Sequence, residues 1–193
     1  MLNYGDKIGI VCCSNGQKRT YIEKIKCLEN TLIDIGLQPV FSDCVYEKES
    51  IFSGTAEERA NALMNFYKDD RIKGIFDISG GDVANSILPY LDYDIIANSS
   101  KMFWGYSDLT TVINAIYKKT GKASVLYQVR NLIYDYKEQQ IANFKNTIIH
   151  MLWSSIFVTL VAKNILFRLR HSCFMWSSVT IITMWAHIIV FNI

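Results

Sequence analysis

The sequence predicts an α/β domain whose mainly parallel sheet is flanked by helices, and three observations lead to this fold class. Short apolar runs alternate with amphipathic stretches through the first 149 residues. The apolar runs end in small or polar residues of the kind that form loops. No internal repeat or low-complexity tract interrupts this order. Strands that alternate with helices form parallel sheets with right-handed crossovers, which are covered on both faces.

The first elements follow from apolar spacing and from helix-end signals. Ile8–Cys13 is an apolar run before polar residues, which indicates a buried strand, and Leu37–Phe41 can form a second. Between them lies a helical stripe that Gly36 suits as C-cap, formed by Tyr21, Ile25, Leu28, Leu32 and Ile35. Thr55–Glu58 has the spacing of a capping box and predicts the start of a second helix.

The alternation continues to about residue 149. Three more strands are predicted, at Ile72–Ile78, Lys101–Tyr106 and Ser124–Val129. A helical pattern follows each of them, at Val83–Leu88, Leu109–Ile116 and Glu138–Ile149, and the second of these helices should stop near Gly121. In such a fold, ligands bind beyond the carboxyl ends of the strands.

The composition changes sharply near residue 150 and divides the chain into two pieces, 1–149 and 150–193. All ten glycines, both prolines and all eighteen acidic residues precede His150. The tail from His150 onward holds all three histidines and has Lys163, Arg168 and Arg170 as its charged residues. We expect the first piece to be the α/β domain and the second to be helical or poorly ordered.

The tail, 150–193, has two interpretations. Residues 174–193 are long and apolar enough to cross a bilayer, so the tail could attach the domain to a membrane. Alternatively, the loss of glycine, proline and acidic residues indicates an out-of-frame translation that replaces a second domain. In either case, so apolar a segment should associate with membranes, with itself or with the exposed edge of the sheet.

The overall charge and the cysteine content limit the partners, cofactors and cellular compartment to be expected. A formal charge of +2 gives no reason to expect nucleic acid as a partner. Five cysteines with no CxxC spacing fit reduced thiols in a cytoplasmic protein, and no metal or organic cofactor is indicated. Residues 1–7 have neither a basic leader nor a long apolar stretch, so secretion is not expected. Cys12 and Cys13 lie in an apolar run and are predicted core residues.

Two loops should meet at the carboxyl edge of the sheet. Gly80–Gly81 follows one apolar run and Gly105–Asp108 follows another. A strand-to-helix turn can expose the Ser107 hydroxyl, while the amides of Gly81 and Asp108 could face one oxyanion. Two alternatives stay open: Ser107 as a helix N-cap, and Gly80–Gly81 as an ordinary turn or a phosphate-binding nest.

Several segments together resemble the LD-carboxypeptidase family of serine peptidases, which includes the microcin-immunity peptidases. The matching pieces keep their order and spacing over about residues 4–149: Gly5–Val11 with Ser14, Ser53–Arg59, Gly80–Gly81, Leu88–Asp94 and Gly105–Asp108. Ser79 stands where many members of the family carry arginine, which leaves the substrate preference open.

The resemblance implies a cytoplasmic enzyme, often dimeric, that cleaves a peptide or amide bond next to a free carboxylate, as in murein L,D-peptides. Ser107 would be the nucleophile, and the amides of Gly81 and Asp108 would form the oxyanion hole. Gly80 and Ser14 would contact the substrate. The family's glutamate and histidine come from a second domain, which no segment of this sequence matches.

A serine hydroxyl is a poor nucleophile without a base. His150, His171 and His187 all lie in or beside the tail, and none has a family-like context or the spacing of a metal site. We therefore expect the chain to be the nucleophile-bearing half of a serine hydrolase, with weak or no activity by itself. The alternative is a non-catalytic domain that binds a carboxylate and is attached to a membrane through its tail.

Overall fold

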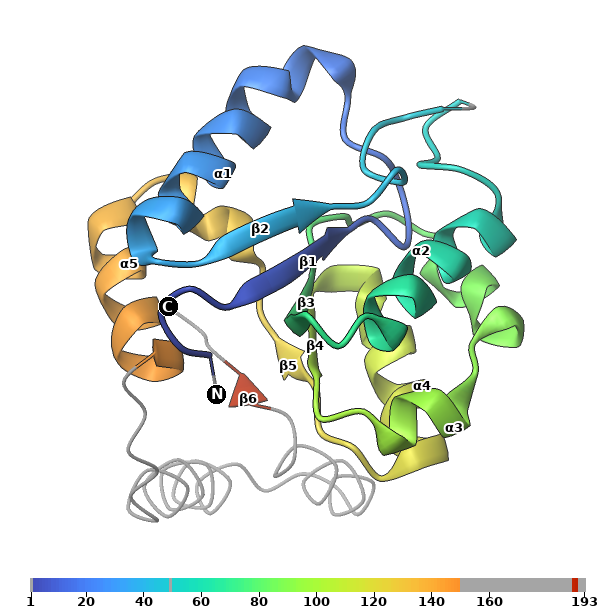
Figure 1. The fold of residues 1–193 in the computed structure, drawn as a ribbon. Coiled ribbons are helices and arrows are strands. Elements are labelled where there is room, and N and C mark those ends of the chain that lie inside the picture. Colours follow the sequence, from blue (N-terminus) through green and yellow to red (C-terminus); the bar gives the residue numbers. More distant parts are fainter. Residues whose placement is uncertain (1, 49, 150–188, 191–193) are drawn as a thin grey trace, which may run out of the picture.

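The computed structural model describes residues 2–48, 50–149 and 189–190, and it confirms the predicted α/β fold with a parallel sheet (Figure 1). The strands lie in the order β2-β1-β3-β4-β5-β6, and every neighbouring pair is parallel. Their bounds are Lys7–Val11 (β1), Gln38–Phe41 (β2), Ile72–Asp77 (β3), Met102–Gly105 (β4), Val125–Leu126 (β5) and Ile189–Val190 (β6). All carboxyl ends therefore meet at one edge, where the two predicted loops emerge.

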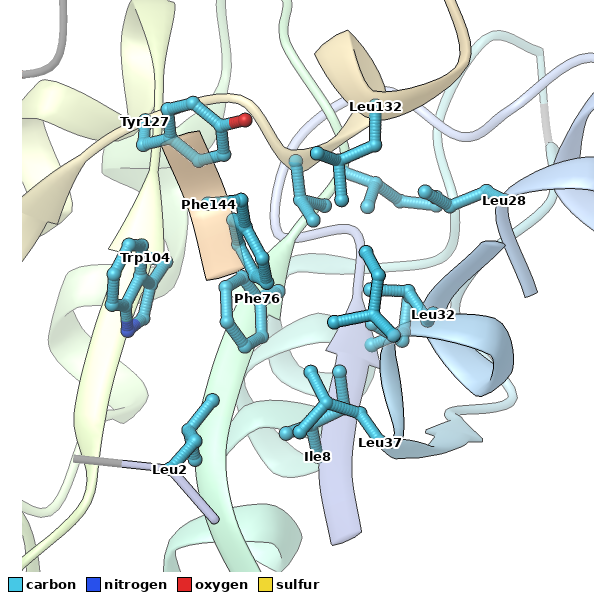
Figure 2. Packing of buried hydrophobic residues seen from close by; sticks show 14 of the residues in the cluster. Leu2, Ile8, Leu28, Leu32, Leu37, Phe76, Trp104, Tyr127, Leu132 and Phe144 are labelled. Carbon is cyan, nitrogen blue, oxygen red and sulfur yellow. The ribbon is translucent and has the colours of Figure 1, made fainter. Parts of the chain in front are cut away.

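One face of the sheet is covered by α1 (Ile22–Ile35) and α5 (Lys137–Phe144), as Figure 1 shows. The core on this face is largely aromatic around Phe76, whose ring stacks on Trp104 with centroids 5.0 Å apart. Figure 2 shows this cluster, in which leucines of α1 pack against the same layer. Burial of α1 follows from its predicted apolar stripe, and Gly36 ends the helix with a φ of 99°, a left-handed conformation that glycine adopts without strain.

The opposite face is covered by α2 (Ala56–Lys68), α3 (Tyr93–Asn98) and α4 (Thr110–Thr120) (Figure 1). The capping box predicted for α2 is present, because Thr55 Oγ1 accepts from the Glu58 amide and Glu58 accepts from the Thr55 amide. Cys13 is buried in this core, and Cys12 in the core of the other face, as predicted.

Four elements differ from the prediction. The helix expected after Gly81 is the 3₁₀ helix η2 (Ala84–Tyr90), and β5 spans two residues because another 3₁₀ helix, η4 (Val129–Ile133), begins where the strand was expected to continue. The last helix changes to a π-helix at Lys145–Ile149. Helix α3 was not predicted, although the Asp92 carboxylate caps it by accepting from the amides of Asp94 and Ile95.

Within the described ranges, no helix combines the length and apolar character that a membrane crossing requires. Apart from Ile189–Val190, which pairs with β5, the tail lies outside the described residues. The two interpretations of the tail, as a membrane attachment or as an out-of-frame translation, therefore stay predictions.

Replacement of Phe76 by alanine tests the aromatic core. Phe76 is fully buried against Trp104 and Phe144, so Phe76→Ala should lower the free energy of unfolding by about 3–5 kcal/mol in denaturant titrations. Ile33→Ala on the exposed side of α1 is the control and should change it by less than about 0.5 kcal/mol. Equal losses in the two variants would contradict this account of the core.

Candidate active site

Ser107 lies immediately after β4 and begins the short 3₁₀ helix η3 (Ser107–Leu109), which leads into α4. Its φ is 62°, in the left-handed region that side chains other than glycine, asparagine and aspartate rarely adopt. The residue is exposed. The turn therefore holds the hydroxyl at the surface of the sheet edge, in a backbone conformation that costs on the order of 1–3 kcal/mol.

The alternative of Ser107 as an N-cap is wrong. The residues that cap η3 and α4 are Tyr106 and Leu109, and neither helix has a side-chain cap hydrogen bond. In this segment the hydroxyls of Thr110 and Thr111 donate instead to the carbonyl oxygens of Ser107 and Asp108. The Ser107 hydroxyl is thus not used to begin the helix.

The Gly80–Gly81 loop lies beside Ser107. A methyl group added at Gly80 would lie 3.8 Å from Ser107 Cβ and 4.0 Å from Ser107 Oγ. At Gly81 the φ is 146°, and an added Cβ would lie 2.4 Å from the Asn15 side chain. Position 81 therefore requires glycine, because of both its backbone conformation and the lack of space for a Cβ atom. At position 80, glycine has no side chain to lie against Ser107.

The main-chain amides of Gly81 and Asp108 donate to no acceptor among the residues that the structure describes. Two buried oxygens in the same region, Asn15 Oδ1 and Asp108 Oδ1, also have no hydrogen-bond partner there. Unpaired polar atoms at loop ends are typical of sites that complete their hydrogen bonds with a ligand or water. The two amides predicted as oxyanion-hole donors, one on each loop, thus have no acceptor within the described part of the chain.

Asp108 is held by both neighbouring loops. Its Oδ2 accepts from the Ser14 hydroxyl at 2.6 Å and from the Ala84 amide at 3.2 Å. Ser14 itself is fully buried, and its Oγ also accepts weakly from the Val83 amide at 3.4 Å. The hydroxyl expected to contact substrate is therefore already engaged beneath the site, and contact of Ser14 with a substrate stays a prediction.

A second carboxylate, Asp77, lies under the loops. It accepts hydrogen bonds from the amides of Cys13 and Ser79, each at 2.7 Å, and from the Ser79 hydroxyl at 2.5 Å. The Ser79 oxygen in turn accepts from the Ser14 amide. Burial raises the pKa of Asp77 to about 6, and the hydrogen bonds oppose that shift only in part. Asp77 thereby joins the end of β1 to the start of the Gly80–Gly81 loop.

Sequence reasoning did not single out three residues near this site: Asp77, Asn15 and the buried Arg59, whose guanidinium donates to the carbonyl oxygen of Cys13. The one available signal was Asp77, an acidic residue inside the apolar run Ile72–Ile78. The histidines His150, His171 and His187 lie outside the described residues, so their positions relative to Ser107 are not described. No cluster of three metal-ligating side chains occurs in the described part of the chain.

An exposed serine on a strained turn at the carboxyl edge of a parallel sheet, beside a paired-glycine loop, defines a class of α/β proteins with a serine-bearing loop site. Comparison with known families narrows this class. The model of the LD-carboxypeptidase N-terminal domain matches residues 8–127. The chain belongs to this family, as its motifs predict.

Two curated relatives and one solved structure illustrate the match. A Bacillus subtilis protein named "probable murein peptide carboxypeptidase" is 28% identical over 120 residues, which cover 62% of this chain and 37% of the relative. The Escherichia coli microcin C7 self-immunity protein MccF is 45% identical over 69 residues, or 36% of this chain and 20% of MccF. A structure of MccF in complex with aspartyl sulfamoyl adenosine has a TM-score of 0.72 and 27% identity, covering 78% of this chain and 46% of that one.

The chain thus spans 37% of the length of the Bacillus subtilis relative, 20% of that of MccF, and less than half of the solved structure's chain. The comparisons show the family over residues 8–127 and the fold of this part of the chain.

Glycine at position 107 should relieve backbone strain. Because an L-residue at φ 62° carries a Cβ penalty that glycine avoids, Ser107→Gly should be more stable than Ser107→Ala by about 1 kcal/mol. Chemical denaturation of the two variants measures this difference, and both lack the hydroxyl. An alanine variant as stable as the glycine variant would contradict the strained turn.

Asp77 should make stability depend on pH. Because burial raises its folded-state pKa to about 6, its contribution is fully present below the unfolded pKa of about 4 and is lost as the pH rises through 6. Relative to Asp77→Asn, the wild type should lose up to about 3 kcal/mol of unfolding free energy across this window. Denaturant titrations of both proteins at several pH values test this prediction. Plots of unfolding free energy against pH that stay parallel for the two proteins would contradict it.

Proposed function

We propose that this chain carries the nucleophile-bearing half of a serine carboxypeptidase, which cleaves a peptide or amide bond next to a free carboxylate. The proposed substrates are murein L,D-peptides or related small peptides, in keeping with the names of two relatives. The observation that carries the proposal is the exposed Ser107 on its strained turn, with the Gly80–Gly81 loop beside its hydroxyl.

In this proposal, Ser107 Oγ attacks the scissile carbonyl carbon. The carbonyl oxygen gains negative charge as the tetrahedral intermediate forms, and the free amides of Gly81 and Asp108 would donate to it. One such donor typically accounts for a factor on the order of 10²–10³ in rate. Ser107 also needs a base to accept its proton, and the described residues include no histidine. The base must come from residues beyond them or from a second polypeptide.

A second candidate function is the binding of a carboxylate without catalysis. It is favoured by the main-chain amides of Gly81 and Asp108, which donate to no acceptor among the described residues and could bind an anion. Attachment of such a domain to a membrane through residues 150–193, and a homodimer, stay predictions. A cytoplasmic setting is likewise proposed, supported by the free thiols of Cys12, Cys13, Cys27 and Cys44.

The test is hydrolysis of an L,D-tetrapeptide by the chain alone and by residues 1–149 fused to the part of the Bacillus subtilis relative that lies beyond the match. Ser107→Ala should lower kcat/KM of the fusion by roughly 10⁴-fold or more. Gly80→Ala should also lower it, because its methyl group would occupy the space over the hydroxyl. Release of the C-terminal amino acid, followed by mass spectrometry, is the measurement.

Ser100→Ala is the matched control, since Ser100 is an exposed serine that precedes β4 at the opposite end of the strand. Its activity should equal that of the unsubstituted fusion. Hydrolysis that survives Ser107→Ala would reject the serine mechanism. Saturable binding of the peptide without cleavage in any form would favour the second candidate.

A further inference from the structure

Arg59, on the first turn of α2, is a buried cation that the proposed chemistry does not use. Its side chain is 4% exposed, and no carboxylate in the described part of the chain lies within ion-pair distance of it. Burial lowers the pKa of its guanidinium. Since burying a charge without an ionic partner is costly, the hydrogen bonds that satisfy this group must hold it in one defined place.

Those hydrogen bonds reach two separate loops and the turn that precedes α2. Nη1 donates to the carbonyl oxygen of Cys13 at 2.6 Å and, more weakly, to that of Val83 at 3.4 Å. Nη2 donates to Ser86 Oγ at 2.9 Å, and Nε donates to the carbonyl oxygen of Gly54 at 3.1 Å. The planar guanidinium therefore bridges the end of β1, the start of η2 and the turn before α2, which no shorter or single-headed side chain can do.

The two bridged loops are the ones that hold Asp108. Cys13 is followed by Ser14, whose hydroxyl donates to the Asp108 carboxylate, and Val83 is followed by Ala84, whose amide donates to the same oxygen. A shift of either loop would therefore move the Asp108 side chain. The main chain of Asp108 adjoins Ser107 in the strained turn, so the orientation of its free amide depends on this arrangement.

We propose that Arg59 is a positioning residue of the Ser107 site: its guanidinium sets Ser14 and Ala84 at the separation that holds the Asp108 carboxylate, and thereby orients the Asp108 amide. The catalytic consequence rests on the proposed function, whereas the geometric one does not. Arg59 does not touch substrate in this account and acts through Cys13 and Val83.

The primary test is amide hydrogen exchange, followed by NMR on the full chain, in Arg59→Lys. Lysine keeps the charge but cannot donate to all three segments at once. Loss of the bridge should speed exchange of the Ala84 amide by roughly tenfold, as expected when about one hydrogen bond is weakened, and should shift the amide resonances of Ser107 and Asp108. Amides of β1 and β3 should keep their protection. Arg71→Lys, at an exposed arginine paired with Asp69, is the control and should change none of these.

A second variant keeps the test decisive if Arg59→Lys folds poorly. Ser14→Ala removes the hydroxyl that donates to Asp108 and leaves Arg59 intact, so it should produce the same local change at Ala84. The double variant should be no faster in exchange than the faster single variant, because both substitutions break the same link. Unchanged Ala84 exchange in a folded Arg59→Lys variant, or in Ser14→Ala, would overturn the proposal. So would equal loss of protection across the whole sheet, which would make Arg59 a general stabilising residue.

Activity gives a separate readout. In the active fusion, Arg59→Lys should lower kcat by about tenfold with KM unchanged, since the interaction affected is one made with the developing oxyanion. A raised KM with unchanged kcat would contradict positioning of the oxyanion donor. If the fusion cleaves nothing, the proposed function fails, and the exchange measurements still decide the role of Arg59.

Discussion

The carboxylate of Asp108 is the interaction on which the site depends, because it joins loops that are far apart in the sequence. Its Oδ2 receives the Ser14 hydroxyl and the Ala84 amide, so the ends of β1, β3 and β4 are held together through one oxygen. Parallel strands bring these ends to a common edge, but the sheet alone does not fix the loops beyond it. A charge-assisted hydrogen bond of 2.6 Å does so more strongly than a neutral one.

Beneath that oxygen, a second layer of buried polar groups keeps the loops rigid. Asp77 holds the amides of Cys13 and Ser79, and Arg59 holds the carbonyl oxygens of Cys13 and Val83. Main-chain donors therefore point to a carboxylate and main-chain acceptors to a guanidinium. These groups carry opposite charge without forming a direct salt bridge, and each fixes its loops through main-chain hydrogen bonds. Such a network specifies one arrangement of the edge, because a partly broken version leaves buried polar atoms unpaired.

Features set by local chemistry were predictable from sequence, and features set by distant contacts were not. The capping box at Thr55 and the C-cap at Gly36 depend on residues within one helical turn, and both are present. The exposed Ser107 beside the glycine pair also followed from strand order. Ser14 and Asp108 lie 94 positions apart, so no spacing rule could have paired them. Arg59 looked like an ordinary helix residue, because its partners are carbonyl groups that every residue carries.

The left-handed backbone at Ser107 has an evolutionary consequence. Glycine would adopt this backbone conformation with less strain than serine. In a lineage that no longer needs the hydroxyl, random substitution would therefore tend to replace the serine. Retention of serine at such a position is therefore informative where retention at a relaxed loop position is not. Among relatives of uncertain activity, the amino acid at this single turn would separate lineages still under selection for the nucleophile from those drifting toward a simple scaffold.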